Sequence, residues 1–201
     1  NESVEFLESH NSIKNILLGF RYSGFLFGDH SGSYPHIPDV DPIVYFSNPR
    51  PGLDAREMYW KSFSEIIHRL LASGKNIYLI YPIPELPVHI SKVSSPFSIF
   101  GNKTLLDVKK TISSRYYFDR NNFILSHLDT LPYGKNLHAI KPFEILCDKE
   151  YCPAVIDNKA LYFDDDHLSV EGSKLLLNGS VIVRDLNFLG ANYTLHQKKR
   201  E

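Results

Sequence analysis

Residues 74–82 read Gly-Lys-Asn-Ile-Tyr-Leu-Ile-Tyr-Pro. After its first residue, the run Asn76–Tyr81 is continuously apolar, which is typical of a strand buried on both faces of a parallel sheet. Upstream, Asp54–Ala72 carries apolar residues at spacings of three and four, and Gly74 follows, so we predict a helix that ends before this glycine. A helix followed by a doubly buried strand is the repeating unit of an α/β fold.

The same alternation extends in both directions along the chain. The predicted strands are Ile13–Phe20, Leu137–Ile140 and Ala160–Phe163, and the further predicted helices are Asp107–Leu131 and Ser169–Asn178. Residues 23–52 are rich in Gly, Ser and Pro and are predicted to be irregular, with room for an edge strand at Ile43–Phe46; residues 85–105 and 142–158 are predicted loops. We therefore predict one α/β domain over residues 1–201, a three-layer sandwich with a mostly parallel sheet.

Composition and charge exclude several classes of function. The chain has 201 residues, of which 43% are hydrophobic, and its net charge of −1 disfavours binding to nucleic acid. It contains neither a Gly-x-Gly-x-x-Gly nor a Gly-Lys-Ser/Thr phosphate loop, so no cofactor is expected. The longest apolar runs are far too short to span a membrane, and no signal-peptide pattern opens the chain. The chain begins at Asn1 without an initiator methionine, which indicates a fragment or a processed product.

The two cysteines, Cys147 and Cys152, lie close together in one of the predicted loops. Two sulfurs do not complete a structural zinc site, and no nearby pair of histidines supplies the other ligands, so no metal is expected. The pair fits a local disulfide in an oxidising compartment, and two reduced thiols are the alternative.

The candidate catalytic residues are Asp164 and His167, at the junction between the run Ala160–Phe163 and the last predicted helix. In a hydrolytic triad the histidine takes a proton from the nucleophile, while the carboxylate orients the ring and stabilises the imidazolium. The alternative is a surface acidic turn whose Asp166 or Ser169 only caps the next helix. We expect Asp165 and Asp166 to be solvated or to act as caps.

This block, Asp164-x-x-His167-Leu168-Ser169-x-x-Gly172, resembles that of SGNH (GDSL-type) hydrolases. More narrowly, it resembles the SGNH domain fused to the acyltransferase family three membrane proteins, bacterial O-acetyltransferases that modify surface polysaccharides such as O-antigen. Three other pieces agree in order. They are residues 14–22, which end in Arg21-Tyr22, residues 74–85, which end in Pro82-Ile83-Pro84-Glu85, and the cysteine pair. The resemblance covers residues 11–178 and implies the SGNH hydrolase fold.

The resemblance assigns no residue of this sequence to the nucleophile. The family's nucleophilic serine lies in a Gly-Asp-Ser block after its first strand, which the resemblance places upstream of residue 13, where no such block occurs. We therefore expect the first strand and its serine to be missing from this sequence; Ser31 and Ser33 are the alternatives. The family takes its oxyanion donors from a Gly and an Asn, and no clean match occurs here. Arg21 and Asn48 are the candidates for binding substrate, and a structural ion pair is the alternative for Arg21.

The resemblance implies O-acetyl transfer to a carbohydrate such as lipopolysaccharide O-antigen, through a Ser-His-Asp triad. The domain would lie in the periplasm as part of a bacterial inner-membrane protein, whose membrane acyltransferase domain supplies the acyl group. Two alternatives stay open: a stand-alone carbohydrate or lipid esterase with water as acceptor, and a glycan-binding module without catalysis.

Overall fold

The computed structural model describes residues 2–28, 34–37, 50–93, 110–180 and 182. In chain order its elements are α1 Glu2–Ser9, β1 Asn15–Leu18, α2 Tyr22–Phe27, α3 Ala55–Ala72, β2 Asn76–Ile80, α4 Ile90–Val93, β3 Ile112–Ser113, α5 Ser114–Leu128, β4 Leu137–Ile140, α6 Pro142–Leu146, β5 Tyr151–Cys152, β6 Val155–Ile156, β7 Lys159–Ala160 and α7 Val170–Asn178. Within these residues, no helix combines the length and apolar character needed to cross a membrane.

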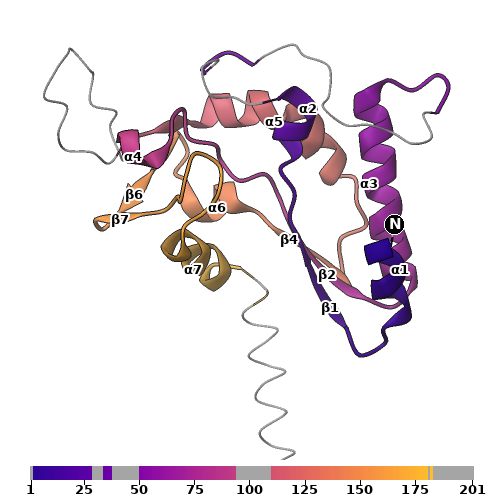
Figure 1. The fold of residues 1–201 in the computed structure, drawn as a ribbon. Helices are drawn as coiled ribbons and strands as arrows, with labels where there is room; N and C mark the ends of the chain where they lie inside the picture. Colours follow the sequence, from indigo (N-terminus) through magenta and orange to yellow (C-terminus); the bar gives the residue numbers. More distant parts are fainter. Residues whose placement is uncertain (1, 29–33, 38–49, 94–109, 181, 183–201) are drawn as a thin grey trace, which may run out of the picture.

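The centre of the fold is a parallel sheet with the strand order β1-β2-β4 (Figure 1). Its middle strand, β2, has the most buried residues, as a strand covered on both faces requires. All three strands run in the same direction. In their register, Ile16 pairs with Ile77, and Ile77 pairs with Leu137. The predicted α/β class with a parallel sheet is confirmed.

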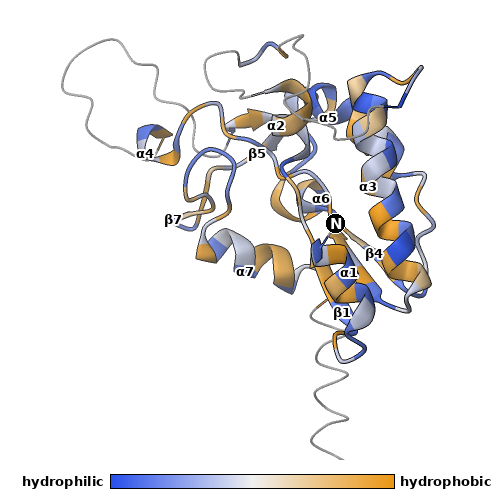
Figure 2. Cartoon of the chain, turned by 45° about the vertical axis from the view of Figure 1, so that its right-hand side comes forward, coloured by the Kyte–Doolittle hydropathy of each residue, from blue (hydrophilic) through white to orange (hydrophobic). Residues whose placement is uncertain are grey.

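Helices cover both faces of this sheet and complete three layers. Alternate residues of β2 point to opposite sides: Ile77 and Leu79 pack with α1, α3 and α5, whereas Tyr78 packs against Leu176 of α7. Figure 1 shows α3 on one side of the strands and α7 on the other. Orange and blue alternate along α3 in Figure 2, which matches a helix with one face against the sheet and one against water.

The helix α3 has the predicted start and end signals. The side chain of Asp54 accepts a hydrogen bond of 2.8 Å from the backbone N–H of Glu57, and so caps the first turn. Gly74 has a φ of +78°, a left-handed conformation that glycine adopts without strain, and the chain turns there into β2.

Three sequence predictions are wrong in detail. Residues 22–27 form the helix α2, inside the segment predicted to be irregular. This short, Gly-containing sequence has little helical propensity, but Tyr22 and Leu26 are fully buried, and packing decides the conformation. The helix predicted at Asp107–Leu131 begins at Ser114, where Ser113 caps it. The short elements α4, α6, β5 and β6 lie in segments predicted to be loops.

The predicted strand Ala160–Phe163 is not part of the parallel sheet. Only Lys159 and Ala160 are in a strand, β7, which pairs with β6 in an antiparallel hairpin. The backbone N–H of Ser169 donates to the carbonyl of Leu161, and that of Phe163 donates to the carbonyl of His167. The following loop thus forms hydrogen bonds with the backbone groups of Leu161 and Phe163 that a parallel strand would use to pair with its neighbour. The predicted edge strand Ile43–Phe46 lies outside the described residues.

A disulfide bond joins Cys147 to Cys152, as one of the two sequence readings predicts. It connects the end of α6 to β5, and β5 pairs with β3 ahead of α5. The bond therefore fixes a small loop beside the hairpin that leads to the Asp164 segment.

Candidate active site at the carboxyl ends of the parallel strands

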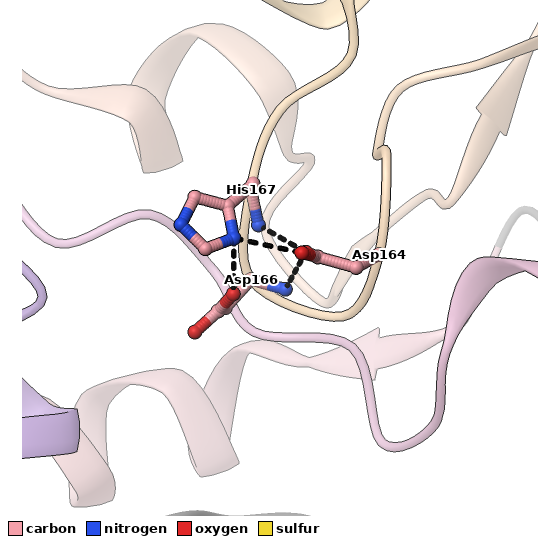
Figure 3. A group of neighbouring side chains, drawn as sticks. All are labelled: Asp164, Asp166 and His167. Atoms are coloured by element: carbon pink, nitrogen blue, oxygen red, sulfur yellow. Dashed lines mark hydrogen bonds and ion pairs between the residues drawn. The ribbon is translucent and has the colours of Figure 1, made fainter.

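The side chain of Asp164 organises a tight loop around His167. One carboxylate oxygen, Oδ1, accepts from the backbone N–H groups of Asp166 (3.0 Å) and His167 (2.7 Å). The other oxygen, Oδ2, lies 2.8 Å from Nδ1 of the His167 ring. In Figure 3 the second ring nitrogen, Nε2, points away from both neighbouring carboxylates. The loop therefore assigns the ring proton to Nδ1 and leaves Nε2 as the proton acceptor.

Neighbouring segments hold this loop in place. The carbonyl of Asp164 accepts from Ile90 N–H, and the carbonyl of Asp165 accepts from Leu86 N–H at 2.6 Å. These bonds attach the loop to the chain that follows β2. As a result, the Asp164 loop lies at the carboxyl ends of the strands, where sites form in parallel sheets, although the predicted strand Ala160–Phe163 does not lead into it.

Asp166 is a functional candidate that the sequence prediction missed. We expected it to be solvated or to cap a helix, but its side chain is only 5% exposed and it lies between the guanidinium of Arg21 and the ring of His167. Its Oδ1 is 2.7 Å from Nδ1 of His167, and its Oδ2 forms an ion pair with Nε of Arg21. The helix cap belongs to Ser169, which accepts from Gly172 N–H. No local signal in the sequence separates Asp166 from Asp165, because the Arg21 contact is long-range.

The charges of the loop shift the pKa values of all three side chains. Burial alone would raise the pKa of Asp164, but hydrogen bonds from the backbone of His167 and Asp166 and from the His167 ring lower it to about 2. Burial raises the pKa of Asp166, against the positive charges of Arg21 and His167. The pKa of His167 is raised, first by its hydrogen bond to Asp164 and then by the charge of Asp166, while burial and the charge of Arg21 oppose the shift.

The directions of these pKa shifts predict how His167 titrates. Its pKa should lie above the ordinary value of about 6.5. It should fall in Asp164→Asn, which weakens the hydrogen bond, and rise further in Arg21→Met, which removes an opposing positive charge. Because the pKa is raised on folding, protonated His167 favours the folded state below the ordinary value, and this contribution disappears as pH rises through the raised pKa. NMR titration of the ring protons measures each value. An unchanged value in Asp164→Asn would contradict the assigned hydrogen bond.

Gly172 lets α7 approach the segment before the loop. A Cβ at this position would lie 2.1 Å from the carbonyl oxygen of Leu161, a backbone atom that has no side-chain freedom to move aside. Gly172→Ala should therefore push α7 away and lower the free energy of unfolding by about 2–3 kcal/mol. Gly134→Ala is the matched control, because nothing lies within 4 Å of its added Cβ. Urea unfolding of both variants measures the effect, and equal stabilities would contradict the close approach.

A cavity of about 260 Å³ opens beside His167. Its walls come from the segment after β1, from the end of β2 and the segment after it, from α5 and from the loop, including Gly19, Arg21, Ser23, Tyr81, Asp166 and His167. The His167 side chain is 67% exposed and so can be reached from solvent. The structure brings Arg21 to this site, as both an ion-pair partner and a cavity residue. Asn48, Ser31 and Ser33 lie outside the described residues.

The same cluster could offer ligands to a cation, but its hydrogen bonds favour another use. Asp164, Asp166 and His167 place ligand-type atoms within 4.8 Å of one another. However, both carboxylates already accept from the loop or from Nδ1, and the positive charge of Arg21 beside Asp166 opposes a second cation. The arrangement is that of a histidine with two orienting carboxylates.

Fold and site together define an α/β domain with a carboxylate-oriented histidine beyond the strand ends, a general arrangement for acid–base chemistry. The family described as "SGNH domain (fused to AT3 domains)" matches residues 1–178. This chain belongs to that family. The sequence resemblance is thereby confirmed.

A solved structure is also similar to this chain. It is described as the Salmonella ser. Paratyphi A lipopolysaccharide acetyltransferase periplasmic domain, and it matches with 17% sequence identity and a TM-score of 0.48. The match covers 69% of this chain and 53% of that one, so that the chain spans about half the length of this relative. No curated protein matches the chain.

Proposed function

We propose that this domain takes part in O-acyl transfer to a carbohydrate, as the periplasmic part of a bacterial inner-membrane acyltransferase. His167 is the general base that takes the proton of a hydroxyl group, and Asp164 orients its ring and stabilises the imidazolium. The observation that carries the proposal is the Asp164 carboxylate, which binds the Nδ1 side of His167 at 2.8 Å while Nε2 points away (Figure 3).

Family membership supports the choice of acyl transfer. Domains of this family are fused to AT3 domains; an AT3 domain of the same protein would supply the acyl group, and a polysaccharide such as O-antigen would accept it. We propose that the SGNH domain occupies residues 1–201 as one unit, with its cavity open to the acceptor. The disulfide bond agrees with an oxidising compartment such as the periplasm.

The position of His167 supports a transferase or an esterase equally well, and the acceptor decides between them. A transferase passes the acyl group to a sugar hydroxyl, whereas an esterase passes it to water. Glycan binding without catalysis remains the second candidate, and one observation favours it: the Arg21 side chain lines the cavity and is 46% exposed, so it can contact a bound sugar.

The test compares the ester content of surface polysaccharide from cells that express the full-length protein or a variant. Asp164→Asn should lower the acyl-ester signal at least about 100-fold, because the ring loses its orienting carboxylate. Asp165→Asn is the matched control, since it removes a neighbouring carboxylate while the hydrogen bonds from Asp164 to His167 keep both of their partners. Equal ester content in both variants would reject the catalytic role of the pair and leave the glycan-binding candidate.

A further inference from the structure

A second cavity, of about 440 Å³, lies next to the one that contains His167. Its walls come from α5, from the residue after β4 and from α6, and Tyr81, which follows β2, lines both cavities. The wall between them is held in place, because the hydroxyl of Tyr117 in the second cavity donates to the carbonyl of Pro82 in the first at 3.1 Å. A long ligand that enters one cavity is therefore adjacent to the other.

Three aromatic rings form the apolar part of this second cavity, which we call the aromatic cavity. Phe143 stacks on Tyr117 with ring centroids 4.8 Å apart, and Phe118 lies against Phe143 at 4.7 Å. Tyr117 is buried, whereas the large apolar side chain of Phe118 is 48% exposed. An exposed ring that neighbouring rings hold in place offers a ligand a rigid, flat apolar surface.

Polar groups surround these rings. The hydroxyl of Tyr81 donates to Oδ1 of Asp129 at 2.9 Å. Nζ of Lys141 lies 3.5 Å from the same oxygen and 3.8 Å from Oε1 of Glu144. The side chains of both acids are exposed, and Asn122 of α5 adds an exposed amide. Together these groups can donate hydrogen bonds to the hydroxyl groups of a ligand and accept from them.

The charges of the aromatic cavity limit the kind of ligand that it can take. Asp129 and Glu144 carry two negative charges against the one positive charge of Lys141, and the lysine is already close to both acids. A phosphate or an acidic ligand would therefore be repelled. A pyranose ring has an apolar face of C–H groups, which suits an aromatic ring, and neutral hydroxyl groups around its edge. A neutral sugar thus fits both parts of the cavity.

We propose that the aromatic cavity binds a neutral sugar unit of the acceptor polysaccharide while another unit of the same chain lies beside His167. This inference rests on the proposed function, from which it takes the carbohydrate acceptor. Phe118 stacks on the sugar face, and Asn122 and Asp129 bind its hydroxyl groups. These contacts do not touch the reacting atoms, so they hold substrate and transition state equally and act on KM and not on kcat.

Equilibrium binding of de-acylated surface polysaccharide to the full-length protein tests this subsite. Phe118→Ala should weaken binding by about tenfold, because the stacking surface is lost. Asn122→Ala keeps all the rings and should weaken binding by about threefold, through one lost hydrogen bond. Phe6→Ala is the matched control, because Phe6 is a similarly exposed ring (52%) in α1 that lines neither cavity.

The control should bind the polysaccharide as tightly as the wild type. If Phe118→Ala and Asn122→Ala did the same, the proposal would be overturned, and an apolar protein segment would be the remaining occupant for the exposed ring.

Kinetics provide a second readout. In acyl transfer to the same polysaccharide, Phe118→Ala should raise KM by about tenfold and leave kcat within about twofold of the wild type. A lower kcat at unchanged KM would place the effect of Phe118 in the reacting geometry and reject the subsite.

The two measurements separate this inference from the proposed function. Binding needs neither an acyl donor nor catalysis, so the difference between Phe118→Ala and Phe6→Ala judges the aromatic cavity even if the domain proves to transfer no acyl group. Conversely, active transfer together with binding that does not depend on Phe118 would reject the subsite alone and leave the proposed function in place.

Discussion

Replacing His167 with Ala is expected to lower acyl transfer by the full-length protein by about 10³- to 10⁴-fold. The variant removes the group that takes the proton, and general-base catalysis contributes factors of this order. Asp164 would keep its hydrogen bonds from the loop backbone but would no longer have an imidazole to orient. The measurement is the initial rate of ester formation on isolated polysaccharide.

The control for this prediction is His68→Ala. His68 is an exposed histidine in α3, and its Nδ1 contacts the carbonyl of Ser64 within the same helix. Its removal should leave both activity and stability unchanged within the error of measurement. If His167→Ala were as active as His68→Ala, the assignment of the general base would be wrong.

Breaking the buried ion pair between Arg120 and Glu85 should have the largest effect on stability. Arg120 is fully buried in α5; its Nε pairs with Glu85, and its Nη2 donates to the carbonyl of Gly28 at 2.9 Å. Arg120→Met deprives a buried carboxylate of its guanidinium partner, which costs about 3–5 kcal/mol in the free energy of unfolding. For a chain of this size, that loss lowers the melting temperature by roughly 10 °C. Urea and thermal unfolding measure both quantities.

The double variant E85L/R120M shows whether this loss comes from an unpaired charge. Replacing both partners with apolar side chains leaves no buried carboxylate, so much of the lost stability should return. If the double variant were as unstable as Arg120→Met, the loss would arise from packing or from the Gly28 contact. Glu85 also lines the cavity, so the pair anchors the Pro82–Glu85 segment beside the site.

The sequence predicts those parts of the fold that local signals determine. The helix α3 has an Asp54 cap and ends before Gly74, and β2 is a continuous apolar run between that glycine and Pro82. The contact between Asp164 and His167 is also local, because it spans a single turn of the loop. Such features need no knowledge of the remaining chain.

The parts that the sequence does not predict depend on partners far away in the chain. The helix α2 forms because Tyr22 and Leu26 pack into the core, although its own sequence is a weak helix former. Asp166 is buried because Arg21, from the other end of the chain, supplies an opposite charge. Neither contact leaves a periodic or local trace in the sequence.

The position of Asp166 between Arg21 and His167 couples the protonation of His167 to the binding of negative charge beside Arg21. The positive charge of Arg21 opposes protonation of His167. Any negative charge that gathers beside Arg21 offsets this effect and increases the affinity of His167 for a proton. Thermodynamic linkage makes the coupling reciprocal, so a protonated His167 also strengthens the hold on that negative charge. Anion binding in the cavity and protonation of His167 would therefore favour each other through one shared carboxylate.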